Sequence, residues 1–294
     1  MEKFFQLAIT GMMVGGLYAM VAAAIVLVYK ATHVVSLAHG QIMSFGALFF
    51  WLALVAFQFP ILLALPTALG MGILLGWAIE RWAMRPLIGQ PLFAAFLTTF
   101  AIFIFMDGAF QLGLKGSALS YSSFFPGGMV SIASIPLPLS QVISFGVALM
   151  MFFALALFFR YTRVGLGMRA TAEDHQLAQS TGISVRSIFT SIWVISALVA
   201  TIAGVALANV MDIHYPLPYV GIKGLIVALV GGLESLTGAL LAGLLLGLLE
   251  NVSSGYLDPL VGGGVKEVAA YVLLLLILLI KPYGLFGLVR IERI

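Results

Sequence analysis

The most polar stretch of the chain lies at residues 162–187, where TRVGLGMRATAEDHQLAQSTGISVRS separates two apolar runs. Thr171 is a residue type that caps helices, and Glu173 and Asp174 follow where the positive end of a helix dipole favours anions. Gly182 is the residue type that ends a helix in the left-handed region. The pattern predicts one helix of about ten residues, roughly 15 Å long. Such an amphipathic helix suits docking into a partner's groove, and an ordinary solvated loop is the alternative.

A second polar group, SLAHGQIMSFGA at residues 36–47, stands where an apolar run begins. It contains His39, Gln41 and Ser44 around the flexible Gly40. Polar groups inside a membrane span are costly, and they usually face a pathway or a partner. These three side chains are therefore candidates for a translocation pathway. The alternative for His39 is a structural histidine that donates to a backbone carbonyl at a helix end.

Signatures of enzymatic chemistry are missing from the sequence. It contains no GxxxxGK[ST] loop, no HExxH motif, no GxSxG motif and no cysteine. Any ATP hydrolysis must then reside on another chain, and no cofactor or metal is expected on this one. A proton relay through acidic side chains is an alternative to simple interface or loop roles. The acids concerned are predicted at or near span ends, and they are Asp107, Asp212, Glu250 and Glu267.

The elements that carry these residues are predicted membrane spans. The chain has 294 residues, 62% hydrophobic and 9% charged, with a mean hydropathy of +1.16, whereas soluble domains carry about 25% charged residues. Because a charge at a helix centre costs roughly 2.5 to 3.5 kcal/mol, long uncharged runs indicate spans. We predict an all-α bundle that forms one transmembrane domain over residues 1–294. It contains a short or re-entrant helix at 220–232 and about eight full spans. The predicted full spans are 4–29, 37–57, 60–80, 91–113, 139–159, 187–210, 236–254 and 266–281.

Basic residues set the predicted orientation. Four arginines lie in the loop at about 160–186, whereas the Ser-, Pro- and Gly-rich loop at 116–138 contains neither Lys nor Arg. The positive-inside rule places the first of these loops in the cytoplasm. Counting spans from there puts the N-terminus outside, together with Lys3. The basic residues form no patch or stripe of the kind that binds nucleic acid.

Four blocks of the sequence resemble the bacterial branched-chain amino-acid (LIV-type) ABC permeases, and the likeness covers nearly the whole chain. The blocks are GLYAMVAAAIVLVY leading to SLAHGQ, then ERWAMRPL, then TRVGLGMRATAEDHQLAQSTGIS, and finally VALVGGLESLTGALLAGLLLGLLENV with KPYGLFG. In that family the third block is the counterpart of the permease loop that docks on the ATPase. The resemblance therefore implies an ATPase-coupling role for Arg169, Glu173, Asp174, His175 and Gly182.

The resemblance also implies an assembly. Its expected partners are a second homologous permease subunit, two ATP-binding-cassette ATPase subunits that carry ATP and Mg, a periplasmic substrate-binding protein, and the lipid bilayer of the bacterial inner membrane. A hydrophobic substrate needs few charges along its route. We therefore expect a mostly apolar pathway, lined from the span after His39 and from the span that carries Thr98 and Thr99.

Some positions depart from the family's pattern. Gln41 stands where Glu is common, Ser36 and Leu37 replace the usual Asn-Phe, and Glu234 and Thr237 replace a Gly and a Pro. The main expectation for the substrate is a branched-chain or other hydrophobic amino acid, and relatives of this type also carry urea, short-chain amides and aromatic acids. A secondary transporter or channel driven by an ion gradient is the rival class. That rival requires acids within the membrane, broken helices in both halves, or a selectivity ring.

Overall fold

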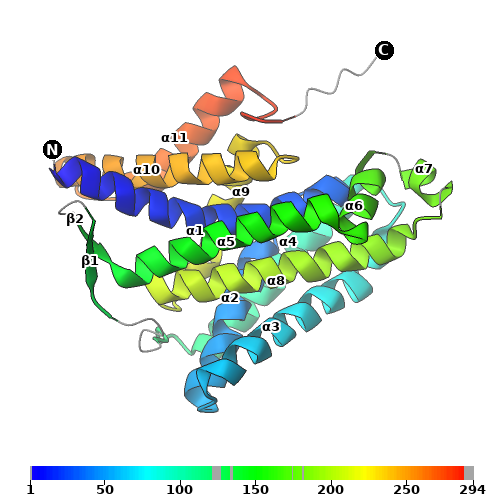
Figure 1. Ribbon diagram of the computed structural model, residues 1–294, viewed down its shortest axis with the longest axis horizontal. Helices are drawn as coiled ribbons and strands as arrows, with labels where there is room; N and C mark the ends of the chain where they lie inside the picture. The colour runs from blue at the N-terminus through cyan, green and yellow to red at the C-terminus, as the bar shows by residue number, and fades with distance from the viewer. Residues whose placement is uncertain (1, 121–126, 133–134, 174, 181, 288–294) are drawn as a thin grey trace.

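The computed structural model describes residues 2–120, 127–132, 135–173, 175–180 and 182–287, which form a bundle of helices with one small hairpin (Figure 1). Short π-helical or 3-10 turns are η1 (Leu52–Ala56), η2 (Ile79–Met84), η3 (Arg85–Leu87) and η4 (Leu217–Tyr219). The strands are β1 (Met129–Ile132) and β2 (Ile135–Pro138). The helices are α1 (Glu2–Thr32), α2 (His39–Trp51), α3 (Ile61–Ala78), α4 (Leu92–Leu114), α5 (Leu139–Tyr161), α6 (Arg163–Glu173), α7 (His175–Ser180), α8 (Val185–Met211), α9 (Val220–Gly231), α10 (Leu236–Val261) and α11 (Val265–Ile280).

Seven helical stretches of the described chain are long and apolar enough to cross a membrane, which confirms the predicted polytopic all-α fold. The last predicted span, α11, has 16 residues, about 24 Å at 1.5 Å per residue against a hydrocarbon core of about 30 Å. The predicted short element is a shorter apolar helix over Leu217–Gly231. The seven long stretches are Glu2–Thr32, His39–Ala56, Ile61–Leu87, Leu92–Leu114, Leu139–Tyr161, Val185–Met211 and Leu236–Val261.

Helix α1 runs through the centre of the bundle, with 94% of its most apolar window buried. A helix that is apolar on every side is expected to be enclosed by others. Helix α10 packs antiparallel against it, with Gly15 facing Gly243 and Gly11 facing Gly247 (Figure 1). A Cβ atom on Gly15 would lie 2.2 Å from the carbonyl oxygen of Gly243. Small residues at this crossing let the two helix backbones approach closely.

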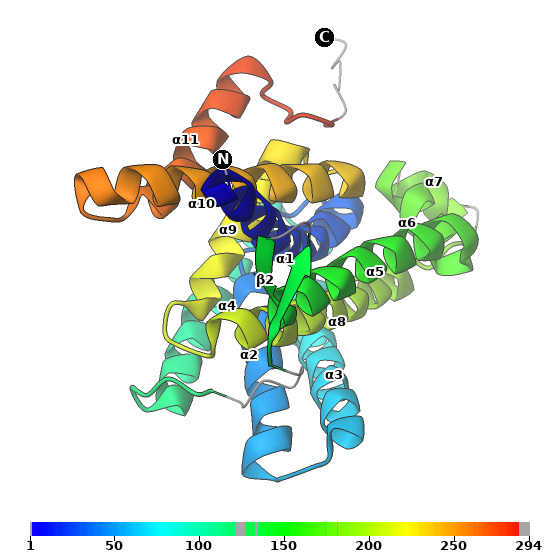
Figure 2. The ribbon, with the colours of Figure 1, turned by 60° about the vertical axis from the view of Figure 1, so that its left-hand side comes forward.

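Two helices begin inside the bundle instead of at its surface. His39, Gly40 and Gln41, in the first turn of α2, are buried, and so is Gly221 in the first turn of α9. A Cβ atom on Gly40 would lie 2.8 Å from the Cα atom of Gly221, so the two helix starts touch. Irregular backbone at membrane depth is tolerated where protein covers it. Figure 2 shows α2, α3 and α4 extending to the opposite side of α1 from α10 and α11.

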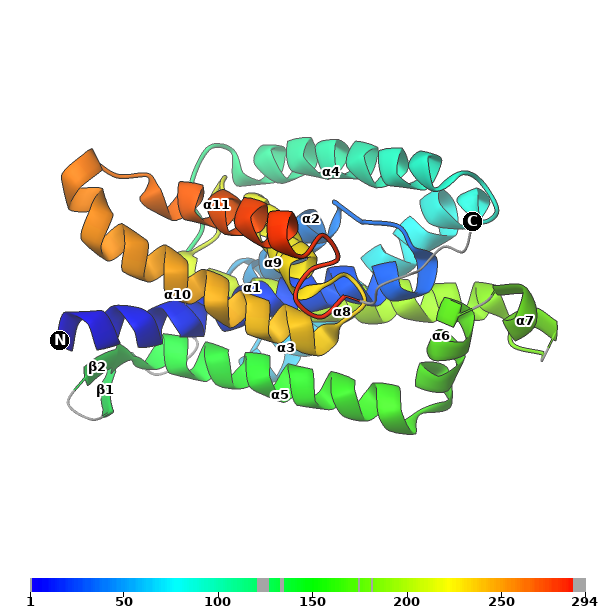
Figure 3. The same cartoon turned by 90° about the horizontal axis from the view of Figure 1, so that it is seen from above.

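The two ends of the bundle are built differently. The start of α1 and the hairpin of β1 and β2 lie at one end, and α6 and α7 lie at the other (Figures 1 and 3). This arrangement agrees with the predicted orientation, in which the N-terminus and the 116–138 loop share the outer side. The prediction of an irregular loop at 116–138 is wrong in part, because Met129–Ile132 pairs antiparallel with Ile135–Pro138.

Candidate functional site

His39 lies in the first turn of α2 and is fully enclosed, with 0% of its surface exposed. Its Nδ1 atom is 2.9 Å from the Ser36 hydroxyl, and its Nε2 atom is 3.1 Å from the Ser196 hydroxyl on α8. The imidazole stacks on the Trp193 indole, with ring centroids 5.5 Å apart. Both ring nitrogens therefore have a partner inside the protein. This geometry favours the structural role for His39 over direct contact with a transported molecule.

Replacing His39 with alanine is expected to lower the stability of the protein by about 1 to 3 kcal/mol, because it leaves the buried Ser36 hydroxyl without its hydrogen-bond partner. Thermal unfolding in detergent measures this change. His214→Ala is the matched control, since the half-buried His214 ring is hydrogen-bonded to the backbone carbonyl of Asp212. A His39→Ala variant with unchanged stability and lowered uptake would instead assign His39 to the pathway.

Gln41 and Asp107 join the start of α2 to α4. The buried amide nitrogen of Gln41 donates to one carboxylate oxygen of Asp107 over 3.0 Å. The Gln111 amide, one turn further along α4, donates to the other oxygen. The carbonyl oxygen of Gln41 is buried and has no hydrogen-bond partner among the described residues. Asp107 is thus held within α4, about two turns before its end at Leu114.

The other predicted pathway residues are hydroxyl groups with local partners. Ser44 donates to the carbonyl of Gly40 over 3.0 Å, and Thr98 donates to the carbonyl of Ala94 over 2.9 Å. Thr99 is fully buried and accepts a hydrogen bond of 3.4 Å from the backbone N–H of Leu37. The structure therefore brings Thr99 to the segment before His39. Assignment of these residues to a pathway stays a prediction.

A charged network lies between α1, α9, α10 and α11, and it is not predicted from the sequence. The Lys223 ammonium is 3.1 Å from Glu250 Oε1 and 3.1 Å from Glu267 Oε1. The Tyr18 hydroxyl donates to Glu250 Oε2 over 3.2 Å. The side chain of Glu250 is 1% exposed, whereas that of Glu267 is 67% exposed.

The prediction that Glu250 lies near a span end is wrong. Helix α10 continues through Pro259 to Val261, which places Glu250 near its middle. Proline is tolerated inside a membrane helix where neighbouring groups satisfy the freed backbone. The sequence feature that points to this charged network is Lys223, which interrupts the apolar stretch of α9. A buried cation in a membrane protein needs an anionic partner.

The polar segment at 162–187 folds as two helices, so the prediction of one helix that starts at Thr171 is wrong. Helix α6 begins at Arg163, because the Thr162 hydroxyl accepts from the N–H of Gly165 over 3.0 Å and caps it. Thr171 lies within α6 and donates to the carbonyl of Gly167. Glu173 therefore ends α6 instead of standing in a first turn.

The second half of this segment ends as predicted. His175 begins α7, and Asp174 lies outside the described residues. Gly182 has φ +85° and donates to the carbonyl of Gln179 over 3.0 Å, which confirms the left-handed stop. Arg169 donates from Nη1 to the carbonyl of Phe159 over 2.8 Å and so ties α6 to the end of α5.

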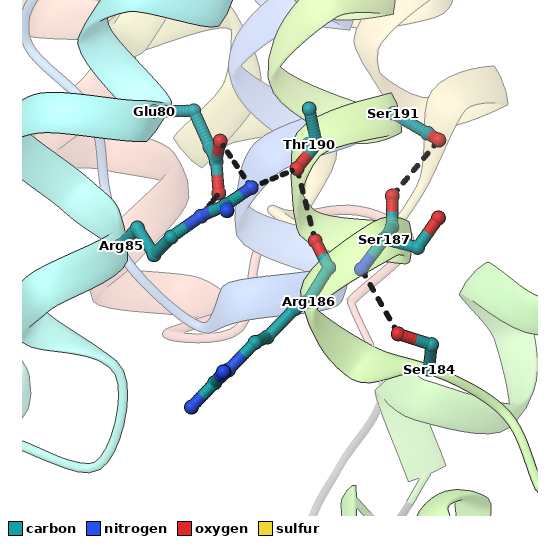
Figure 4. A network of polar contacts seen from close by, with 7 residues as sticks. All are labelled: Glu80, Arg85, Ser184, Arg186, Ser187, Thr190 and Ser191. Atoms are coloured by element: carbon teal, nitrogen blue, oxygen red, sulfur yellow. Dashed lines mark hydrogen bonds and ion pairs between the residues drawn. The ribbon is translucent and has the colours of Figure 1, made fainter.

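A polar network fixes the start of α8 beside this segment (Figure 4). The Arg85 guanidinium donates to both carboxylate oxygens of Glu80, over 3.0 and 3.1 Å, and to the Thr190 hydroxyl on α8 over 2.8 Å. Such two-pronged pairing is geometrically specific. The Ser184 hydroxyl caps α8 by accepting from the N–H of Ser187. The turns η2 and η3, which continue α3, are therefore braced against the helix that follows the polar segment.

A cavity of about 380 Å³ lies between this segment and the buried start of α2. Trp193, which stacks on His39, and Gln179, which lies in α7, both line it. Most of its other lining side chains are apolar, among them Met84, Leu87 and Phe189. The cavity thus adjoins the polar segment through Gln179, and Trp193 separates it from His39.

The seven long apolar helices of the described chain define a polytopic helical membrane protein. The match to a known family is more specific. Residues 7–281 match the family of branched-chain amino acid transport system permease components, and the chain belongs to this family.

Individual relatives resemble the chain over nearly its whole length. The high-affinity branched-chain amino acid transport system permease protein LivH of Salmonella typhimurium is 29% identical, covering 99% of this chain and 98% of its own. BraD of Pseudomonas aeruginosa, described in the same words, is also 29% identical with the same coverage. A probable branched-chain amino acid permease, LivH of Methanocaldococcus jannaschii, is 27% identical over 92% of this chain and 89% of its own.

One solved structure shares the fold. It is described as PsaBC from Streptococcus pneumoniae in complex with Fab, and it superimposes with a TM-score of 0.51 at 14% identity, covering 94% of this chain and 92% of that chain. At this identity the likeness supports the arrangement of helices alone.

Proposed function

We propose that this chain forms half of the translocation pathway of an ATP-driven importer for branched-chain or other hydrophobic amino acids in the bacterial inner membrane. A second homologous permease subunit supplies the other half, and two ATP-binding-cassette ATPase subunits bind ATP and Mg. A periplasmic binding protein delivers the substrate. Family membership and the substrates named for LivH and BraD support this proposal.

The observation that carries the proposal is the segment formed by α6 and α7. It lies at the end of the bundle opposite the N-terminus (Figures 1 and 3). Arg169 and the Thr162 cap anchor it to α5, and Gly182 turns the chain back into α8. A segment anchored at both ends transmits a push from a docked ATPase to the helices that hold it. We assign the coupling role to Arg169, Glu173, Asp174, His175 and Gly182.

The pathway is proposed to run past the buried start of α2. His39, Gln41, Ser44, Thr98 and Thr99 lie on α2 and α4, and the 380 Å³ cavity adjoins this region from the side of the coupling segment. His39 takes a supporting place here, because both of its ring nitrogens are already bonded. Movement of α7 and α8 would change this cavity directly, since Gln179 and Val185 line it.

One observation supports the alternative that the chain is a secondary transporter. Glu250 lies within a membrane helix, which that class of protein requires of its carboxylates. Its carboxylate, however, is held in an ion pair with Lys223 and accepts a hydrogen bond from Tyr18, so it is tied to neighbouring helices instead of facing an open path. The family match and the coupling segment therefore favour the ATP-driven importer.

Cysteine crosslinking tests the docking role directly, because the native chain contains no cysteine. Cysteines introduced at Ala172 in α6 and at the exposed Gln179 in α7 are expected to crosslink to the ATPase subunits. Ser131→Cys, on the hairpin at the other end of the bundle, is the control and should react only with reagents added from the periplasmic side. Labelling of Ala172→Cys from the periplasm, with no crosslink to an ATPase, would refute the proposed docking.

A further inference from the structure

Asp107 is a carboxylate inside a membrane-spanning helix, and none of the roles above uses it. It lies within α4, whose apolar window is the least buried of the seven long stretches at 17%. Its side chain is half-buried, so the carboxylate is neither enclosed by protein nor fully open. A carboxylate at this depth is costly unless it faces a polar partner or an aqueous path.

The partners of Asp107 are neutral amides that leave its charge uncompensated. Gln41 and Gln111 each donate one hydrogen bond to it, from α2 and from the next turn of α4. Because the Gln41 nitrogen points at the carboxylate, its carbonyl oxygen must point elsewhere, and this oxygen is buried without a hydrogen-bond partner among the described residues. A buried unpaired acceptor costs about 1 to 3 kcal/mol. A donor that is absent from the protein itself would remove that cost.

Aromatic side chains also lie near the Asp107 carboxylate. Tyr219, at the end of η4, lies beside the part of α4 that carries Asp107, and its hydroxyl is 3.3 Å from that of Tyr215. The Phe103 ring, one turn before Asp107 on α4, packs edge to face on Tyr219 at 6.2 Å. The faces of phenol and phenyl rings attract cations. A positively charged ligand is favoured by each of these groups, namely the carboxylate, the amide oxygen, the phenol oxygen and the aromatic ring.

A cavity lies next to this group, towards the end of the bundle that carries the hairpin (Figure 3). It measures about 420 Å³ and is lined by Gln111, Ala118, His214 and Tyr215, among others. Gln111 is bonded to Asp107, and Tyr215 is bonded to Tyr219, so the inner wall of the cavity adjoins Asp107 and Tyr219. The volume falls in the range of small-molecule sites, about 300 to 1,000 Å³.

We propose that Asp107, the Gln41 carbonyl oxygen and Tyr219 form a binding site for the α-ammonium group of the transported amino acid, directly behind the Gln111 and Tyr215 side chains that line the 420 Å³ cavity. An ammonium group has three donors, which match a carboxylate oxygen, an amide oxygen and a phenol oxygen. Its charge balances that of Asp107, so the site is neutral only when it is occupied. This proposal rests on the proposed function and specifies which part of the substrate the membrane domain recognises.

Protection of a cavity cysteine from labelling tests the site without the binding protein. Ala118→Cys, on the cavity wall, is introduced into the cysteine-free chain, and the complete complex is treated with a maleimide. Leucine and 3-methylbutylamine, which both carry an ammonium group, are expected to slow the labelling of this chain. The matched acid 4-methylpentanoate, which has the same branched chain and no ammonium, is expected not to.

In the Asp107→Asn variant the protecting concentration of leucine is expected to rise about tenfold or more, as for the loss of a charge-assisted hydrogen bond. Asp212→Asn, which removes an acid bonded to Ser120 at the same end, is the control and should leave it unchanged. Should Asp107→Asn fail to fold, Gln41→Met is the second variant. It removes both the unpaired oxygen and the amide that donates to Asp107, keeps a side chain of similar volume, and is expected to raise the protecting concentration of leucine in the same direction.

Equal protection by the amine and the acid, or unchanged protection in both the Asp107 and Gln41 variants, would overturn the site. ATP-dependent uptake by the wild-type complex is measured in parallel. Uptake with unchanged protection in the variants refutes the ammonium site and leaves the proposed function standing. Absence of ATP-dependent uptake, with protection that depends on Asp107, refutes the proposed function and keeps the site.

Discussion

Replacing Lys223 with methionine is expected to destabilise the protein by about 3 to 5 kcal/mol, the usual cost of removing one partner of a buried ion pair. The Glu250 side chain, 1% exposed, would be left as an uncompensated charge inside the membrane domain. The Tyr18 hydroxyl would remain as a hydrogen-bond donor to it, but a neutral donor does not replace a cation. Thermal unfolding in detergent, together with the amount of folded protein recovered from the membrane, measures the effect.

The double variant Lys223→Met and Glu250→Gln separates charge from packing. It removes both charges, and the amide oxygen at position 250 still accepts from Tyr18, so much of the lost stability is expected to return. Glu250→Gln alone should cost less than Lys223→Met alone, because Lys223 keeps the exposed Glu267 as its partner. Equal stability of Lys223→Met and the wild type would show that the pair contributes nothing to the fold.

A second large effect is expected at the crossing of α1 and α10. Gly15→Ala places a methyl group 2.2 Å from the backbone oxygen of Gly243, which no side-chain movement relieves. The central helix must then shift, and overpacking of this kind costs typically about 1 to 3 kcal/mol. Loss of stability in thermal unfolding is the expected result, although alanine is a better helix former than glycine.

Gly146→Ala in α5 is the matched control for this substitution. Gly146 is exposed, and a Cβ atom there has nothing within 4 Å in the described chain. Its replacement should be neutral, or stabilising by up to about 1 kcal/mol through helix propensity. If both alanine variants unfold at the same temperature, the close approach of α1 and α10 is not what holds the bundle together.

Most membrane helices could be located from the long uncharged runs of the sequence, because a charged residue inside the hydrocarbon core is expensive. The end of α10 could not, since this helix continues past Glu250 to Val261. The stop at Gly182 was also predictable, since its left-handed backbone is one that glycine adopts without strain. The division of the coupling segment into α6 and α7 was not. Thr162 and Thr171 are equally good cap residues in the sequence, and only the packing of α6 against α5 and α8 selects Thr162.

The contents of the membrane interior were harder to predict for a different reason. Lys223, Glu250 and Tyr18 are far apart in the sequence and meet only when α1, α9 and α10 pack together. Gln41 was predictable as a pathway candidate, but its partner Asp107 was placed at a helix end with an interface role. A single sequence gives the periodicity of each helix and not the partners that face it across the bundle.

The central claim is that this chain transports substrate only as part of an ATP-driven assembly. Its most direct test is uptake of labelled leucine by proteoliposomes that contain either the complete complex or this chain alone. We expect uptake by the complete complex when the binding protein is outside and hydrolysable ATP is inside, and none by the chain alone under a proton or sodium gradient. Gradient-driven uptake by the chain alone would contradict the account.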